Sequence, residues 1–292
     1  MLRNFIYIFI IIFSGLITFS PSSSFSKELN SDFKLIKIIV PSEGEYYSFA
    51  GDLCSIINKN LKSNKIRCLV EAVESKDIAI ERLKISSNEL ALLEIDQYLS
   101  LTAIDQNIKI VMNIYDNSFS FIVRDDSNIS DFEDLLGKKI GINPKKIDSS
   151  FLNPDFLNLL SINSNNVNFI EVALKDQTKL LCDKEIDALL VFAPQPNSYQ
   201  KNGFFLCNLS FLNIDQKIID NISNSKNYFS SSVIKAGSYS NNPLDINSFG
   251  KKTMLVTSSR SDDELIYNLI KAILDEKANI IYLRDNFPGF SS

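Results

Sequence analysis

Short apolar runs alternate with amphipathic segments along most of this chain. Apolar runs of about four to eight residues between polar or turn-forming residues are typical of buried strands. They predict strands at 34–40, 66–72, 90–95, 108–114, 120–123, 139–142, 167–172, 186–192 and 254–257. Elsewhere the apolar residues recur with the period of a helix, which predicts helices at 46–61, 77–85, 129–136, 155–160, 177–183 and 262–274, and another beginning at Asp96.

The order of these elements predicts the fold class. A β-α-β-α-β succession occurs before residue 120 and starts again after it, without a long linker. This order is typical of an α/β fold in which a mixed, mostly parallel sheet has helices on both faces. We therefore expect two such lobes, the first formed by 27–119 with about 241–292 and the second by 120–240. The Asn- and Ser-rich stretch 213–232 carries no comparable signal.

The first 26 residues have the layout of a secretory signal peptide. Arg3 provides a positive charge, residues 5–19 form an apolar run, and Ser24 and Ser26 place small residues before a cleavage site. An uncleaved anchor is the alternative, but the apolar run of 15 residues is shorter than the roughly 20 of a spanning helix. We expect cleavage near Ser26 and a periplasmic mature protein. The first cysteine, Cys54, lies far from the cleavage point, so no acylated cysteine is expected there.

The charge of the mature chain excludes one class of partner. Without residues 1–26 the chain has 29 Lys and Arg against 35 Asp and Glu, a formal net charge of −6, and no basic run. Nucleic-acid binding normally needs a basic cluster, so no nucleic acid is expected as a partner. No later stretch is apolar over enough residues to predict a second membrane span.

The chain has no histidine and four cysteines, Cys54, Cys68, Cys182 and Cys207. Because no two cysteines have C-x-x-C spacing, neither the usual zinc sites nor histidine-dependent catalysis is expected. We expect no metal and no cofactor. Among three possible connectivities, the pairing of sequence neighbours, Cys54–Cys68 and Cys182–Cys207, is preferred. Buried free thiols are the alternative.

Candidate binding residues lie in the loops that follow the predicted strands. In α/β sheets, ligands bind beyond the carboxyl ends of the strands, where loops and helix N-termini converge. The loops 41–47, 73–77, 94–98, 143–149 and 193–199 have this position. Their candidate ligand-binding residues are Ser42, Gly44, Tyr46, Tyr47, Glu74, Ser75, Glu94, Asp96, Asn143, Lys145, Pro196 and Asn197.

These residues also have structural interpretations. Ser42 is equally suited to cap the following helix, and Pro196 with Asn197 to form a turn. Glu74, Glu94 and Asp96 are more typical of solvated loop charges than of ligand contacts, although their places at strand ends favour the cleft side. Since helical neighbours point about 100° apart, only one ring of Tyr46 and Tyr47 is expected to face a ligand.

Several segments resemble a known family in their order and spacing. Residues 41–47 (PSEGEYY) are similar to a Gly-Ser-x-x-Gly-x-Tyr-Tyr loop, and 122–129 (IVRDDSNI) to a strand that enters a second lobe. Further similar segments are 134–142 (DLLGKKIGI), 185–191 (EIDALLV) with Pro196 and Asn197, and 236–239 (AGSY). From residue 35 to about 275 the chain therefore resembles the TAXI group of TRAP-transporter solute-binding proteins.

This resemblance implies the type II periplasmic-binding-protein fold and a function. A protein of this group captures a small polar metabolite, an amino acid or a carboxylate, in the cleft between its lobes. It then delivers the solute to the membrane subunits of a TRAP-type transporter. The resemblance thus implies a monomeric receptor that binds its ligand without chemistry, and no enzyme activity is expected.

The candidate loops depart from the family pattern in three places. Residues 73–76 (VESK) replace a Gly-rich turn, 94–96 (EID) replace Gln-x-Asp, and 143–148 (NPKKID) replace Gly-Pro-x-Gly-Ser-Gly. Glycines let the backbone approach an anion closely, so their loss weakens that way of binding. Two alternatives follow: Lys145 and Lys146 supply the missing positive charge, or Glu74, Glu94 and Asp96 hold an amine.

Two other function classes stay open from the sequence alone. Glu94 and Asp96 are close enough in sequence to form an acid/base pair of carboxylates, as in a hydrolase. Alternatively, the cleft has degenerated, and the protein acts as a sensor or as a receptor for another protein. The first alternative predicts turnover, and the second predicts a protein partner other than a transporter subunit.

Overall fold

The computed structural model describes residues 33–276, apart from 42–44, 104–105, 145–146, 148 and 163–165. The predicted signal peptide lies outside these residues. So do three candidate binding residues, Ser42, Gly44 and Lys145, together with Lys146.

The first α/β unit is built on three parallel strands in the order β2-β1-β3. Its strands are β1 (Lys34–Pro41), β2 (Ile66–Val73) and β3 (Glu89–Glu94), and its helices are α1 (Glu45–Asn60), α2 (Lys76–Ile85), α3 (Ile95–Thr102) and α8 (Asp263–Asp275). β1 is apolar throughout its centre because it is buried on both faces. Ile38 belongs to the cluster with Leu53 and Leu269 from α1 and α8, whereas Ile39 belongs to the cluster with Leu83 from α2.

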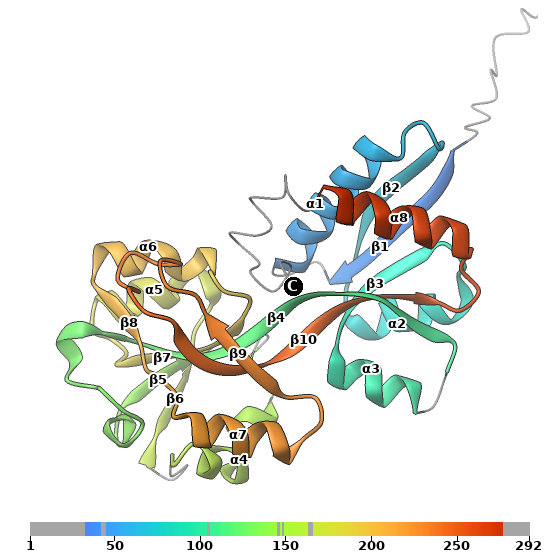
Figure 1. Ribbon diagram of the computed structural model, residues 1–292. Coiled ribbons are helices and arrows are strands. Elements are labelled where there is room, and N and C mark those ends of the chain that lie inside the picture. Colours follow the sequence, from blue (N-terminus) through green and yellow to red (C-terminus); the bar gives the residue numbers. More distant parts are fainter. Residues whose placement is uncertain are drawn as a thin grey trace, which may run out of the picture. The chain divides into compact units, whose positions relative to one another are not determined.

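Two long antiparallel strands connect this unit to the rest of the sheet. β4 (Ile108–Arg124) pairs with β10 (Ile246–Ser258), and β10 also pairs with β3, as Figure 1 shows in green and orange. The sheet therefore follows a single path, β2-β1-β3-β10-β4-β7-β5-β6. The two strands approach closely at Gly250, where a Cβ atom would lie 2.2 Å from the Asn117 backbone oxygen.

The second α/β unit contains the remaining strands and helices. Its strands are β5 (Lys139–Ile142), β6 (Asn168–Glu171), β7 (Ala188–Ala193), β8 (Leu209–Phe211) and β9 (Ser230–Ile234), and its helices are α4 (Pro154–Leu159), α5 (Leu174–Cys182), α6 (Ser198–Leu206) and α7 (Gln216–Ser225). β5 is parallel to both β6 and β7, whereas β8 and β9 pair antiparallel with β4 and β10. Seven buried phenylalanines belong to its largest core cluster, in which the rings of Phe119 and Phe249 stack.

The α/β fold class with a mixed sheet is confirmed, but the break predicted between two strands is wrong. The strands predicted at 108–114 and 120–123 are parts of the single strand β4. The polar residues between them continue the ladder, since Asp116 is paired with Lys252 and Asn117 with Lys251 of β10. Buried Asn117 donates a hydrogen bond to the Thr253 hydroxyl over 3.2 Å, so its polar side chain has a partner within the sheet.

The helix predicted at 129–136 is also wrong, because only a short 3₁₀ turn (Glu133–Leu135) forms there. The Asp134 carboxylate accepts hydrogen bonds from the backbone and hydroxyl of Ser130. The Asp131 carboxylate accepts from the amides of Glu133 and Asp134. Side chains that bind nearby amides in this way compete with helix formation.

Four elements, α6, α7, β8 and β9, were not predicted. In α7 the buried apolar positions are Ile219 and Ile222, and most of the other residues are polar. This pattern is too sparse to mark a helix in an Asn- and Ser-rich sequence.

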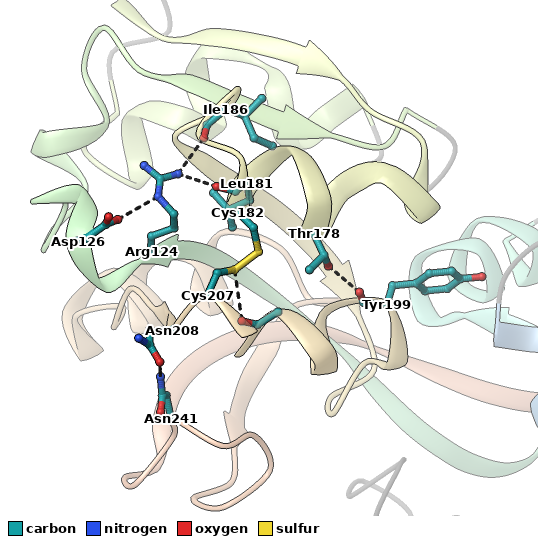
Figure 2. The surroundings of a disulfide bond; sticks show 11 residues. Arg124, Asp126, Thr178, Leu181, Cys182, Ile186, Tyr199, Cys207, Asn208 and Asn241 are labelled. Carbon is teal, nitrogen blue, oxygen red and sulfur yellow. Dashed lines mark hydrogen bonds and ion pairs between the residues drawn. A yellow bond between two sulfur atoms is a disulfide. The ribbon is translucent and has the colours of Figure 1, made fainter. Parts of the chain in front are cut away.

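Both preferred cysteine pairings are present as disulfides. Cys54–Cys68 ties α1 to β2, and Cys182–Cys207 ties the end of α5 to the residue after α6 (Figure 2). Among the helices that the structure describes, none is long and apolar enough to cross a membrane.

Candidate functional site

A cavity of about 580 Å³ is lined by residues of both α/β units and of β4. Six candidate residues lie in its wall: Tyr46, Glu74, Ser75, Glu94, Asn143 and Asn197. They come from the ends of β2, β3, β5 and β7 and from the starts of α1 and α6. The cavity therefore lies where ligands usually bind in α/β sheets, beyond the carboxyl ends of the strands.

Glu94 is the centre of a polar cluster in the wall of the first unit. Its Oε1 accepts hydrogen bonds from the Tyr46 hydroxyl at 2.9 Å, from Lys76 Nζ at 3.2 Å and from Asn117 Nδ2 at 3.5 Å. Lys76 Nζ also lies 5.2 Å from the centroid of the Tyr46 ring. The cluster thus combines a carboxylate, an ammonium group and an aromatic face.

The Tyr46 hydroxyl stays protonated in this cluster. Burial, and next the negative charge of Glu94, raise the pKa of Tyr46 well above its usual value. The phenol is therefore a hydrogen-bond donor to the carboxylate at any pH near neutrality. Its neighbour Tyr47 is 47% exposed and is not part of the cavity wall, so only one ring of the pair lines the cavity.

Ser75 and Glu74 lie where β2 leads into α2. The Ser75 hydroxyl accepts a hydrogen bond from the Ile78 amide at 3.4 Å and so caps the helix. Glu74 and Asp77 are exposed parts of the cavity wall, and neither forms an ion pair with any residue that the structure describes. Their carboxylates thus add negative charge next to the cluster of Glu94.

Asp96 is not part of the cavity wall. Its carboxylate pairs with Lys251 Nζ at 2.6 Å, and the Lys251 side chain is only 1% exposed. The lysine nitrogen lies 5.1 to 5.8 Å from the centroids of four rings, those of Phe151, Phe192, Tyr228 and Phe229. Asp96 is therefore the counter-ion of a buried lysine, a contact that its sequence position did not indicate.

The polar residues with which the second unit lines the cavity are mostly neutral amides, set among apolar residues such as Leu190 and Phe192. Asn143 is buried at the end of β5, and its Nδ2 donates to the Val172 carbonyl at 3.3 Å. Gln200 of α6 is fully buried and donates from Nε2 to Gln177 Oε1 of α5 at 2.9 Å. Gln200 Oε1 is buried and accepts no hydrogen bond from the described residues.

Asn197 is both a wall residue and a helix cap. Its Oδ1 accepts a hydrogen bond from the Tyr199 amide at 2.9 Å, which caps α6, and its own amide donates to the Tyr239 hydroxyl. Pro196 is buried beside it but is not part of the wall. Asn197 therefore lines the cavity and at the same time caps α6.

The described wall carries three carboxylates, Glu74, Asp77 and Glu94, against one lysine, Lys76, and no arginine. Among the described residues, this excess of negative charge disfavours a carboxylate without an amine, one of the two ligand types that the resemblance implied. Lys145 and Lys146, which follow Asn143 in the chain, lie outside the described residues. The described residues include no group of three or more Asp, Glu or Cys side chains placed to hold a metal ion.

Residues 41–286 match the NMT1-like family, which is most of the chain. This protein belongs to the NMT1-like family. No curated protein sequence matches the NMT1-like chain.

The NMT1-like chain is similar in fold to several solved solute-binding proteins. One is substrate-binding domain 2 of Lactococcus lactis GlnP in an open conformation, with 14% identity, coverage of 87% of this chain and 95% of that one, and a TM-score of 0.52. A TctC solute-binding protein from Polaromonas has 16% identity, 88% coverage of each chain and a TM-score of 0.53. The periplasmic aliphatic sulphonate-binding protein SsuA of Escherichia coli has 12% identity, coverage of 86% and 77%, and a TM-score of 0.51. At these identities the likeness establishes the fold, which is that of periplasmic solute-binding proteins.

The wall residues of the NMT1-like chain that were not among the sequence candidates include Tyr115, Asn117, Gln177, Tyr199 and Gln200. Tyr115 and Asn117 lie in the middle of β4, and the other three lie on helices. Figure 2 shows the Tyr199 side chain extending away from the Cys182–Cys207 disulfide, while the Thr178 hydroxyl donates to the Tyr199 carbonyl at 2.6 Å. The disulfide therefore braces the two helices that carry Gln177, Tyr199 and Gln200.

Proposed function

We propose that this NMT1-like protein is a periplasmic solute-binding receptor that captures a small polar solute and delivers it to a TRAP-type membrane transporter. The observation that carries the proposal is the cavity of about 580 Å³, whose wall combines residues of both α/β units. A volume of this size suits a small molecule. Its buried amides and tyrosines supply the few placed polar groups that fix a solute's orientation.

Binding and closure are coupled when a solute contacts both units. A solute held by Tyr46 and Glu94 of the first unit, and by Gln177 and Asn143 of the second, stabilises the arrangement in which both sets are in reach. We propose that the units correspond to the lobes expected at 27–119 with 241–292 and at 120–240. The connecting strands β4 and β10 then contain the hinge, as in hinge closure around other ligands.

Two observations support a location in the periplasm. The first 26 residues have the pattern of a signal peptide. The two disulfides belong to an oxidising compartment, since thiols stay reduced in the cytosol. We therefore place the mature receptor outside the inner membrane, as a monomer that contacts its transporter transiently.

The assignment to a TRAP-type transporter rests on the resemblance of five segments to the TAXI group. Co-purification of the protein with membrane transporter subunits from the cell that produces it tests it. Solute-dependent capture of TRAP-type subunits supports the assignment, whereas capture by subunits of an ATP-driven importer replaces it.

The partners of Glu94 and Asp96, the two carboxylates that an enzyme would use, favour binding without chemistry. Glu94 already accepts hydrogen bonds from Tyr46, Lys76 and Asn117, and Asp96 is paired with Lys251. The two carboxylates thus have different partners, which gives no support to a shared acid/base reaction.

Native mass spectrometry of mature protein, purified without denaturation, tests the receptor function. We expect an adduct with the mass of a small solute, and stabilisation by one compound in a thermal-shift screen of amino acids, keto acids, dicarboxylates and polyamines. Tyr199→Ala, which shortens a 40% exposed wall side chain, should weaken that binding about tenfold, roughly the 1–2 kcal/mol of an aromatic contact.

Tyr267→Ala is the matched control, since Tyr267 of α8 is 64% exposed and is not part of the wall. It should leave the binding unchanged. The receptor function is wrong if no adduct is found and no compound in the screen stabilises the protein. If both tyrosine variants bind the solute like the wild type, the solute does not contact Tyr199, and the assignment of its site to this part of the cavity is wrong.

A further inference from the structure

We propose that the solute carries a protonated amine, which binds Glu94 and the Tyr46 ring at the place that the Lys76 ammonium group occupies in this structure. This inference rests on the proposed function and names the solute's chemistry. It narrows the amino acid or carboxylate that the family resemblance implies to a solute with an amine.

Lys76 shows what the site accepts. Its Nζ lies 3.2 Å from Glu94 Oε1 and 5.2 Å from the centroid of the Tyr46 ring. A carboxylate beside an aromatic face is a favourable environment for an ammonium group. The protein's own ammonium group therefore marks a site for the amine of a solute.

Lys76 is suited to leave this place. It is the first residue of α2, its side chain is 28% exposed, and its four-carbon stem has many rotamers. Glu74 and Asp77, its neighbours in the chain, are exposed and unpaired among the described residues. A displaced ammonium group thus finds other carboxylates nearby, so its displacement costs little.

The hydrogen bonds of the cavity wall also favour a solute that donates hydrogen bonds. Tyr46, Lys76 and Asn117 all donate to Glu94 Oε1, and the capping box of α3 adds a hydrogen bond from the Gln97 backbone amide to the Glu94 side chain. Gln200, fully buried in α6, lines the same cavity with an Oε1 that accepts no hydrogen bond. A buried acceptor without a donor is costly, and N–H groups of a solute would satisfy it.

The charge of the described wall favours the same chemistry. Three carboxylates against one lysine repel an anion and attract a cation, and partial burial strengthens the effect. A carboxylate solute would have to take Lys76 from Glu94 and leave that carboxylate, 15% exposed, without its counter-ion.

Three probes of one chain length separate these cases. Cadaverine, 5-aminopentanoate and glutarate have five carbons and end in two amines, one amine with one carboxylate, and two carboxylates. Titration calorimetry of the mature protein should show binding of cadaverine or 5-aminopentanoate and none of glutarate. If none of the three binds, the solute identified by native mass spectrometry takes their place, and a solute without a basic nitrogen overturns the inference.

Two wall variants give opposite results for a cation and an anion. Lys76→Met removes the competing ammonium group and should strengthen binding of the amine about three- to tenfold. Glu94→Gln removes the carboxylate and should weaken it more than tenfold, about what the loss of a charge-assisted hydrogen bond costs. Lys84→Met, which removes the same charge from the last turn of α2, is the matched control and should change the affinity less than twofold.

Binding of glutarate would distinguish an anionic solute from an amine. If glutarate binds and Lys76→Met abolishes its binding, the solute is an anion, and the receptor function stands without the amine. If the wild type binds no probe and carries no adduct, the receptor function itself fails. Thermal unfolding of each variant confirms that Glu94→Gln is folded, and rescue of amine binding by Glu94→Asp distinguishes a lost ligand contact from a damaged wall.

Discussion

The surroundings of Lys251 explain the role of Asp96. Its ammonium group is 1% exposed, lies among four aromatic rings and pairs with Asp96. Removing one partner of a buried ion pair leaves a charge without compensation, which is far more costly than losing an exposed pair.

We therefore predict that Asp96→Asn lowers the free energy of unfolding by about 3–5 kcal/mol. The double variant Asp96→Asn with Lys251→Met should recover part of this loss, because it removes the buried charge as well. Urea denaturation measures both. Asp183→Asn, which breaks the exposed pair of α5 with Lys179, is the control and should cost less than about 1 kcal/mol. An Asp96→Asn variant as stable as this control would contradict the role of Asp96.

The residues of the site were only partly predictable. Glu74, Glu94, Asn143 and Asn197 follow strands, so position in the sequence was enough to place them at the cavity. Asn117 was not predictable, since it lies inside a strand and reaches the cavity because β4 pairs with β10. The partner of Asp96 lies 155 residues away, and no local pattern reports such a contact.

Among the elements of the first unit, α2, β2 and β3 are joined by Arg82. Arg82 of α2 contacts Glu71 of β2 and Glu89 of β3. Hydrogen bonds from Arg82, and next from Lys37, lower the pKa of Glu71 from 4.5 to about 2. Because the folded-state pKa is below the unfolded one, the pair contributes stability that is complete above pH 4.5 and is lost as the pH falls toward 2.

We predict that Glu71→Gln flattens the stability of the protein between about pH 4.5 and pH 2 relative to the wild type. Melting temperatures across this range measure the effect. Added salt should weaken it, because the Glu71 side chain is 38% exposed. Glu81→Gln, at an exposed position of α2, is the control and should leave the pH dependence unchanged. Parallel curves for the wild type and Glu71→Gln would contradict the prediction.

The elements themselves were predictable where apolar periodicity is strong. β1, α1 and α8 were predicted nearly to the residue, because each buries a continuous apolar face. Prediction failed where polar side chains decide. Asp131 and Asp134 bind the amides of a would-be helix, and the polar centre of β4 resembles a turn although it continues a strand.

At the scale of the whole molecule, the fold and the site support each other. Both disulfides tie helices that carry or flank the cavity wall, Cys54 in α1 with Tyr46 and Cys182 in α5 with Gln177. The two strands that connect the α/β units carry Asn117 into the wall. A solute bound there contacts residues from both units, which is the basis of the proposed receptor function.

Hydrogen–deuterium exchange with and without the co-purified solute tests whether a bound solute contacts both α/β units. We predict slower exchange on both sides of the cavity, in peptides that cover 74–97 and in peptides that cover 177–200, together with the middle of β4. Peptides of α7, whose residues are not part of the wall, serve as the internal control and should not change. Protection confined to one unit, or no protection at a saturating concentration of solute, would contradict a receptor that closes on its ligand.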